Sequence, residues 1–325
     1  LVQTCVVQLN QSRSAAEADA LSPAALAISA PGPLDPWKGI LIDPPNMHRS
    51  LWGFDLVAAL ADRLRLPAAI ERDTQVAALA EQSYGAAKGL SDFIYLTVST
   101  GVGGAVVSDG RLLRGPDGVA GELGHMVVDM DGPPCGCGSR GHLEAFASGT
   151  GIVAAVRAAL AAGDISSDGP LGRQISERGE TALGARDVAQ ADAAGDPVAA
   201  RIMEQARQAF AAAVVSMVDI FNPQRIIVGG GVANGQGERL LGPARERVRR
   251  ESFRSQARRV EIVAGGLGDD VGLLGAVPLV RLAGLKPNAT RPDGMAFHSD
   301  PAAGDDVNEQ ATNTDDQRSA AAAPG

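Results

Sequence analysis

The chain contains 325 residues, 45% of them hydrophobic and 3% aromatic, and it carries a formal net charge of −9. This length accommodates two modest domains or one large α/β domain, and the acidic charge argues against nucleic acid as the main partner. We expect no membrane span and no secretory leader, since no apolar run approaches spanning length, and the three cysteines do not suggest a disulfide framework, which points to a reducing cytoplasm.

Strands alternate with helices along most of the chain, which predicts an α/β fold. A β-branched and aromatic run at 93–98 is typical of a buried strand, and a glycine-rich turn at 99–104 joins it to a second strand at 105–107. The other elements are expected, in chain order, as a helix at 1–20, a strand at 25–29, a strand at 41–42, a helix at 54–64, a strand at 68–71, helices at 76–84, 150–162 and 197–221, a strand at 225–228, a helix at 238–251, a strand at 260–264 and a helix at 269–282. Residues 286–325 are polar and aperiodic, which predicts a disordered tail.

Two of the four histidines and two of the three cysteines lie close together in the sequence, as His125, Cys135, Cys137 and His142. Thiolate sulfur and imidazole nitrogen are the ligands of tetrahedral zinc, and intervening glycines let a short loop turn tightly. The alternative is a chance grouping of free thiols and surface histidines. Because cysteine is rare in this chain, the grouping favours a zinc site.

Two glycine-rich segments follow predicted strands, at Thr100–Gly104 and Gly229–Gly231. Backbone amides exposed at such turns form anion-binding concavities, and glycine lets a phosphate approach closely. Neither segment matches the Walker lysine motif or the dinucleotide fingerprint, and a tight hairpin explains the first nearly as well. Together they favour a nucleotide cleft between strand ends.

Three acidic residues are candidates for chemistry. Asp73 stands where a short strand gives way to a helix, so it can be a helix N-cap or a general base that takes a proton from an attacking hydroxyl. From position alone, the cap is the simpler role. Glu122 and Glu144 are solvated loop acids by default, but beside a metal-ordered loop they could accept hydrogen bonds from a polyol.

These motifs resemble the signature of the ROK family (repressors, open reading frames and sugar kinases), and they are closest to its bacterial glucokinase branch. The resemblance covers about residues 5–285. The segments that carry it are, in family order, Ala30–Asp35, Pro45–Asn46, Glu71–Asp73, Thr100–Gly104, Gly121–His125, Cys135–Gly138, Gly141–Glu144 and Ile227–Gly231.

The resemblance implies two domains of the actin-like ATPase (ribonuclease H-like) fold, with sugar and ATP bound between them. The small α/β domain would comprise 1–72 and about 270–285, the large α/β domain with the zinc loop would comprise 73–269, and 286–325 would be the tail. The family's N-terminal strand and Asp-x-Gly-Gly-Thr phosphate turn do not occur in this sequence. We therefore expect a small domain truncated at its N-terminus.

The resemblance also implies a role for each candidate residue. Asp73 would activate the sugar 6-hydroxyl, and His125 would use one ring nitrogen for zinc and the other for the sugar. Zinc would be structural and would order the loop that directs the acids. The sugar-binding residues would be Gly32, Asn46, Asp73, Glu122, His125 and Glu144. The ATP-binding residues would be Thr100, Gly101, Gly103 and Gly104 at the phosphates, with Gly229, Gly230 and Gly231 lining the adenosine pocket. The metal ligands would be His125, Cys135, Cys137 and His142.

Two residues depart from the family pattern within the matched segments. His142 stands in place of the third cysteine of the zinc site, and imidazole is a competent replacement. Arg72 stands in place of the asparagine that usually precedes the catalytic aspartate. We expect its guanidinium to depress the pKa of Asp73 and weaken it as a base, unless Arg72 points away or selects a different sugar.

The resulting expectation is ATP-dependent phosphorylation of a hexose at the 6-hydroxyl, with glucose as the first choice, Mg²⁺ as the partner of ATP, and a cytoplasmic homo-oligomer (dimer or tetramer) as the working form. One alternative is a catalytically impaired sugar-binding fragment or pseudokinase. A second is a kinase for another sugar such as N-acylmannosamine, fructose or allose. A DNA-binding repressor of the same family is disfavoured, because the chain is acidic and no helix-turn-helix precedes the sugar domain.

Overall fold

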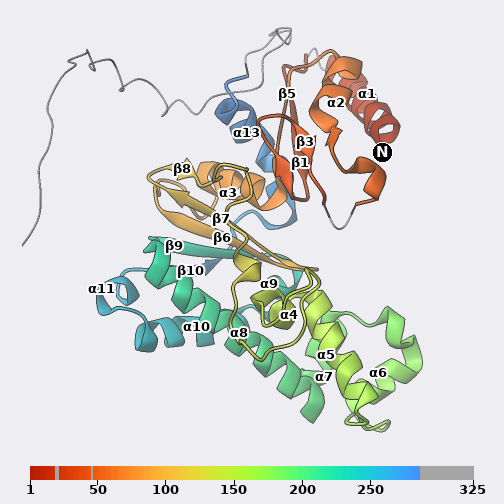
Figure 1. The fold of residues 1–325 in the computed structure, drawn as a ribbon, viewed down its shortest axis with the longest axis vertical. Helices are drawn as coiled ribbons and strands as arrows, with labels where there is room; N and C mark the ends of the chain where they lie inside the picture. Colours follow the sequence, from red (N-terminus) through yellow and green to blue (C-terminus); the bar gives the residue numbers. More distant parts are fainter. Residues whose placement is uncertain (19–21, 45–46, 286–325) are drawn as a thin grey trace, which may run out of the picture.

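The computed structural model describes residues 1–18, 22–44 and 47–285. Figure 1 shows a smaller group of elements from the N-terminal part of the chain, together with the last helix, beside a larger group built on a five-stranded sheet. The division of the chain into domains at residues 72 and 270 stays a prediction.

The smaller group combines two short sheets with two helices. β1 (Leu26–Ala30) pairs in parallel with β5 (Ala68–Arg72), so that Ala30 lies opposite Arg72. The other elements are α1 (Val2–Ala18), β2 (Leu34–Asp35), β3 (Ile40–Leu41), η1 (Arg49–Leu51), β4 (Phe54–Asp55) and α2 (Leu56–Leu64). β2, β3 and β4 form an antiparallel sheet. Most apolar side chains of the group pack into one core, whereas Ala27 and Ala69 pack against a separate cluster that contains Leu279.

The five-stranded sheet has the order β10-β9-β6-β7-β8. Its strands are β6 (Phe93–Val98), β7 (Val102–Ser108), β8 (Arg111–Leu112), β9 (Arg225–Gly229) and β10 (Glu261–Ala264). β6, β9 and β10 are parallel neighbours, whereas β6, β7 and β8 are antiparallel. Side chains alternate between faces, as a strand requires: Ile94 and Leu96 pack on one face, and Phe93 and Tyr95 on the other.

Helices cover both faces of this sheet (Figure 1). α3 (Asp73–Tyr84) packs on the Phe93 and Tyr95 face, and α8 (Pro197–Phe221) and α10 (Glu238–Glu251) pack on the opposite face. The long α8 begins after its N-cap Asp196, whose carboxylate accepts the amide hydrogens of Val198 and Ala199 at 3.0 Å. The remaining elements are η2 (Leu123–His125), α4 (Leu143–Ala147), α5 (Gly149–Ala161), α6 (Pro170–Arg178), η3 (Glu180–Ala182), α7 (Ala185–Ala193), α9 (Gly231–Gln236), α11 (Arg254–Ala257), η4 (Gly268–Asp270), α12 (Val271–Leu274) and α13 (Ala276–Leu282).

Several predicted boundaries were wrong. The turn after β6 does not extend to Gly104, because β7 already begins at Val102, which pairs with Val98. α3 begins at Asp73, three residues before the predicted start, so Asp73 is the first helical residue and Arg72 takes the N-cap position. The predicted last helix is interrupted into η4, α12 and α13.

Two further predictions concern the C-terminal tail and membrane-spanning helices. The expected disordered tail at 286–325 lies outside the described residues. Among the residues that the structure describes, no helix combines the length and apolar character that a membrane crossing needs.

Candidate active site

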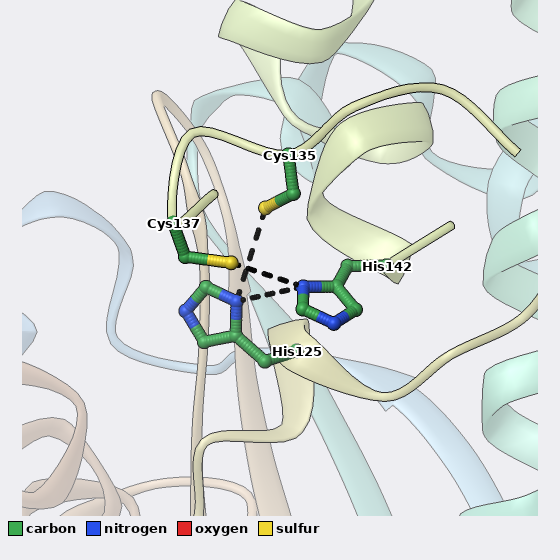
Figure 2. Close-up of side chains that lie close together, drawn as sticks. All are labelled: His125, Cys135, Cys137 and His142. Carbon is green, nitrogen blue, oxygen red and sulfur yellow. Dashed lines mark hydrogen bonds between the residues drawn. The ribbon is translucent and has the colours of Figure 1, made fainter. Parts of the chain in front are cut away.

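Four side chains converge at one point of the larger group, and we call them the metal cluster: His125, Cys135, Cys137 and His142 (Figure 2). One potential ligand atom from each lies within 4.8 Å of all the others. Nδ1 of His125 is 3.3 Å from Nδ1 of His142 and 3.9 Å from Sγ of Cys135. Sγ of Cys137 is 3.3 Å from Nδ1 of His142.

These distances fit zinc. Zn–N bonds of about 2.0–2.1 Å and Zn–S bonds of about 2.3 Å place neighbouring tetrahedral ligands roughly 3.3–3.8 Å apart. Burial, as the largest cause, raises the pKa of the Cys135 thiol, so metal binding would have to displace that proton. His142 in place of a third cysteine still points its nitrogen at the other three ligands. The donor set therefore suits a closed structural site.

The local backbone explains how a short loop brings these ligands together. His125 is the last residue of η2. Val127 forms an isolated antiparallel β-bridge with His142, which directly precedes α4. Gly141 lies between them with φ +70°, and a Cβ at this position would lie 1.7 Å from the carbonyl oxygen of Asp129. Only glycine fits there, because any side chain would push the two strands of the loop apart.

Glu144 connects the metal cluster to the first glycine-rich turn. Its Oε2 accepts the amide hydrogen of Val102 at 2.9 Å, and its Oε1 is 3.8 Å from Sγ of Cys135. A Cβ on Gly101 would lie 2.6 Å from Oε2 of Glu144, so the carboxylate lies directly against the turn. Thr100 is exposed at the tip of that turn. One carboxylate thus contacts both the metal loop and the predicted phosphate turn.

The two glycine-rich turns lie side by side at the carboxyl ends of the parallel strands β6 and β9. Thr97 pairs with Gly229, and a Cβ on Gly230, where φ is +95°, would come within 2.6 Å of the Val98 carbonyl oxygen. A Cβ on Gly231 would lie 3.9 Å from Oγ of Ser99. This edge of a parallel sheet is where α/β proteins bind their ligands.

Gly103 and Gly104 lie within β7, beyond the turn. A Cβ on Gly103 would lie 2.5 Å from Cγ2 of Thr74, and one on Gly104 would lie 2.7 Å from Cδ1 of Leu123. These glycines therefore let the start of α3 and the η2 segment approach the sheet closely. Their role at the ATP phosphates stays a prediction.

Asp73 is exposed at the first residue of α3, and its Oδ1 accepts the amide hydrogen of Thr74 at 2.7 Å. Desolvation by the surrounding protein raises the pKa of its carboxyl above the ordinary 3.8, while Thr74 and Arg72 oppose this effect. The Arg72 guanidinium lowers the pKa of Asp73, as expected, but desolvation outweighs this effect and the pKa is raised overall. An accessible carboxylate with a raised pKa is better suited to accept a proton.

Arg72 points into the site, where its side chain is 4% exposed. Its Nη1 donates to Oε1 of Glu122, its Nη2 to the carbonyl oxygen of Ala120, and its Nε to Oε1 of Gln75 at 3.1 Å. A Cβ on Gly32 would lie 2.7 Å from Cδ of Arg72, which places Gly32 beside the same side chain. Oε2 of Glu122 is 4.0 Å from Nε2 of His125, so the ring nitrogen that points away from the metal cluster faces Glu122.

The structure thus brings several predicted site residues together: Arg72, next to Asp73 in the chain, contacts Glu122, whose other oxygen faces His125. Cys135 lies near both His125 and Glu144. Asn46 lies outside the described residues. Sequence reasoning missed the ion pair between Arg114 and the fully buried Glu71, with Nε 2.7 Å from Oε2. Its members are 43 residues apart, and no motif marks Arg114. It also missed Gln75, although the separation of three residues from Arg72 on a helix start could have suggested their contact.

A profile of the ROK family matches residues 3–283. The chain belongs to the ROK family. A glucokinase from Thermotoga maritima is 37% identical over 257 residues, which cover 79% of this chain and 78% of that protein. An N-acetylmannosamine kinase from Citrobacter koseri is 37% identical over 256 residues, which cover 79% of each.

A solved structure of a ROK family glucokinase from Streptomyces griseus, in complex with glucose and AMPPNP, matches with a TM-score of 0.69 and 31% identity. The match covers 86% of this chain and 88% of that one. The predicted α/β architecture of the actin-like ATPase fold is confirmed by this likeness and by the ROK profile.

Proposed function

We propose that this ROK protein transfers the γ-phosphoryl group of ATP to the 6-hydroxyl of a hexose. The observation that carries the proposal is the position of Glu144: one oxygen is near Cys135 of the metal loop, and the other accepts the amide hydrogen of Val102 directly after the Thr100–Gly101 turn. This places a carboxylate suited to sugar hydroxyls beside a turn suited to phosphate. Relatives named glucokinase and N-acetylmannosamine kinase support a hexose-type substrate, and we take glucose as the first sugar to test and N-acetylmannosamine as the second.

In this proposal, Asp73 accepts the proton of the 6-hydroxyl as the sugar oxygen bonds to the γ-phosphorus and the bond to ADP breaks. Glu122, His125 and Glu144 accept or donate hydrogen bonds to ring hydroxyls and so orient the 6-hydroxyl toward Asp73. The backbone of Gly32 lies beside Arg72 and can add a contact from the smaller group of elements. Positioning of this kind supplies much of the rate enhancement in phosphoryl transfer.

The exposed turn at Thr100–Gly101 and the adjacent Gly229–Gly231 segment are the groups proposed to bind ATP, with Gly103 and Gly104 close behind the first turn. When bound, Mg²⁺ would offset the charge that develops on the phosphoryl oxygens. The metal cluster would hold zinc and order the loop from Glu122 to Glu144 without contributing to the reaction.

The test measures sugar-dependent ADP formation with glucose and with N-acetylmannosamine, in the unmodified chain and in Asp73→Ala. We expect Asp73→Ala to lower turnover by roughly 10²- to 10⁴-fold, the range of a lost general base, while zinc content is retained. Turnover of the variant at the unmodified rate would refute the role of Asp73. Sugar binding by the unmodified chain with no phosphorylated product would instead favour a non-catalytic sugar-binding protein.

A further inference from the structure

Two consecutive residues of β5 contact both ends of the loop that leads to Glu122. Arg114 Nε donates to Oε2 of Glu71 at 2.7 Å, at the start of the loop. Arg72 donates to the carbonyl oxygen of Ala120 and to the carboxylate of Glu122, at its end. The amide of Ala120 also donates to the carbonyl oxygen of Arg114 at 2.9 Å, which closes the loop on itself.

The β5 side of this arrangement is buried: Glu71, Arg72 and Gln75 are all buried, whereas Glu122 is exposed. Glu71 is 0% exposed, and its Oε1 accepts the backbone amide hydrogen of Arg72 at 3.1 Å. Gln75 adds a second contact to the Ala120 carbonyl oxygen, from Nε2 at 3.4 Å. We call the contacts of Arg72 with Gln75, Ala120 and Glu122 the Arg72 clamp.

The clamp binds one carboxylate oxygen of Glu122 and leaves the other beside His125. Oε1 is occupied by Arg72, whereas Oε2 faces the ring of His125, and the Glu122 side chain as a whole is 46% exposed. A planar guanidinium contacts two neighbouring oxygens in a fixed geometry, which a short neutral amide cannot reproduce. Asp73, the candidate base, directly follows Arg72 in the chain. The Arg72 side chain therefore connects the backbone next to Asp73 to Glu122, a candidate sugar ligand.

We infer that Arg72 is a positioning residue for the sugar: it fixes Glu122 so that Oε2, beside His125, accepts a ring hydroxyl while Asp73 faces the hydroxyl that reacts. The inference rests on the proposed function. Arg72 thereby acts on sugar affinity and leaves nucleotide affinity unchanged.

The first measurement is sugar affinity by calorimetry with glucose and N-acetylmannosamine. We expect Arg72→Ala to weaken binding of the preferred sugar roughly ten- to a hundredfold, as for lost charge-assisted hydrogen bonds, with AMPPNP affinity unchanged. Arg72→Lys keeps the charge without the planar geometry, so we expect it to recover part of the loss. Arg111→Ala, which changes an exposed arginine on β8, is the control. It should keep sugar affinity within about threefold, the ordinary scatter for residues away from a site.

A second measurement separates the clamp from the proposed function. Amide hydrogen exchange at residues 120–125, in the absence of sugar, should speed up at least tenfold in Arg72→Ala and stay unchanged in Arg111→Ala, because local protection reports local opening. Unchanged exchange in Arg72→Ala, or sugar affinity within threefold of the unmodified chain, overturns the inference. If the unmodified chain binds neither sugar, the proposed function fails and the positioning role with it, whatever the exchange shows.

Discussion

The metal cluster and the Arg72 clamp hold opposite ends of the segment 120–125. They differ in how far apart in the sequence their residues lie. The cluster uses ligands between positions 125 and 142, whereas Arg72 reaches partners 48 and 50 residues away. Glu122 lies between the two, since one of its oxygens contacts Arg72 and the other faces His125. A candidate binding residue such as Glu122 can therefore be held on one side by residues close to it in the sequence and on the other by a residue far away in the sequence.

The two supports also differ in what they need. The cluster needs an ion, because two thiols and two imidazoles have no strong attraction for one another without one. The clamp needs only the charges and hydrogen bonds that the chain itself provides. Removing the metal therefore tests one support while leaving the other in place.

Removal of a metal ligand should have the largest effect. We expect Cys135→Ala to lose stoichiometric zinc and to weaken sugar affinity by about a hundredfold or more, because the ordering of the loop between Glu122 and Glu144 depends on the ion. The measurements are elemental analysis of the purified protein and calorimetry with glucose. Cys5→Ala, on α1, is the matched control, since it removes a thiol far from the cluster in sequence. Full glucose affinity in a zinc-free Cys135→Ala protein would contradict a role for the metal in sugar binding.

The metal cluster could be predicted because its evidence is local and chemically narrow. Few functions call for two cysteines and two histidines in so short a segment, and Gly141 provides the left-handed backbone that their approach requires. The strand at 93–98 and the helix at 197–221 could be predicted for a similar reason, because a buried strand and a long periodic helix carry their own pattern. The short strands β2, β4 and β8 were missed.

The clamp could not be predicted, because neither the partners of Arg72 nor the burial of Glu71 leaves a pattern in sequence. Desolvation by neighbouring protein atoms also decides the direction of the pKa shift of Asp73. Arg72 lowers this pKa, but the desolvation that raises it depends on packing that the sequence does not reveal. Packing also explains why Gly103 and Gly104 were wrongly predicted to lie in a turn. They lie within β7, where the absence of a side chain makes room for Thr74 and Leu123.

Two glycine-to-alanine substitutions, one beside Arg72 and one in the metal loop, compare the clamp and the metal cluster more finely. Gly32→Ala would place a Cβ 2.7 Å from Cδ of Arg72, so the clamped side chain must shift. A Cβ on Gly136, in the metal loop, meets no atom within 4 Å. We expect Gly32→Ala to weaken glucose binding about three- to tenfold, as a small displacement of a positioned group does, and Gly136→Ala to change it less than twofold.

A double-mutant cycle identifies the cause of the Gly32→Ala effect. If the methyl group acts through Arg72, its effect should disappear in the Arg72→Ala background, because coupled residues are not additive. If the loss is the same in both backgrounds, Gly32 acts directly on the sugar through its backbone, and the link to the clamp fails.

The smallest expected effect is on the pH dependence of activity. Asp73 accepts a proton only when ionised, so kcat/KM should fall as pH drops through its pKa, which desolvation raises above 3.8. Arg72 is one of the groups that lower this pKa. Replacing it by the neutral Asn should therefore raise the pKa further and move the acidic limb of the kcat/KM profile to higher pH.

The direction of that shift separates two roles of Arg72, positioning Glu122 and stabilising the ionised form of Asp73, which a measurement of sugar affinity alone cannot separate. Loss of the clamp lowers kcat/KM at every pH, whereas loss of the nearby positive charge moves the limb itself. Arg72→Lys keeps the charge, so its limb should stay near that of the unmodified chain even where its sugar affinity is reduced. Arg111→Ala, an exposed change on β8, should leave both the limb and the plateau unchanged. A limb that moves to lower pH in Arg72→Asn would show that Arg72 does not stabilise the ionised form of Asp73 during turnover, and the charge of Arg72 would then act only on Glu122.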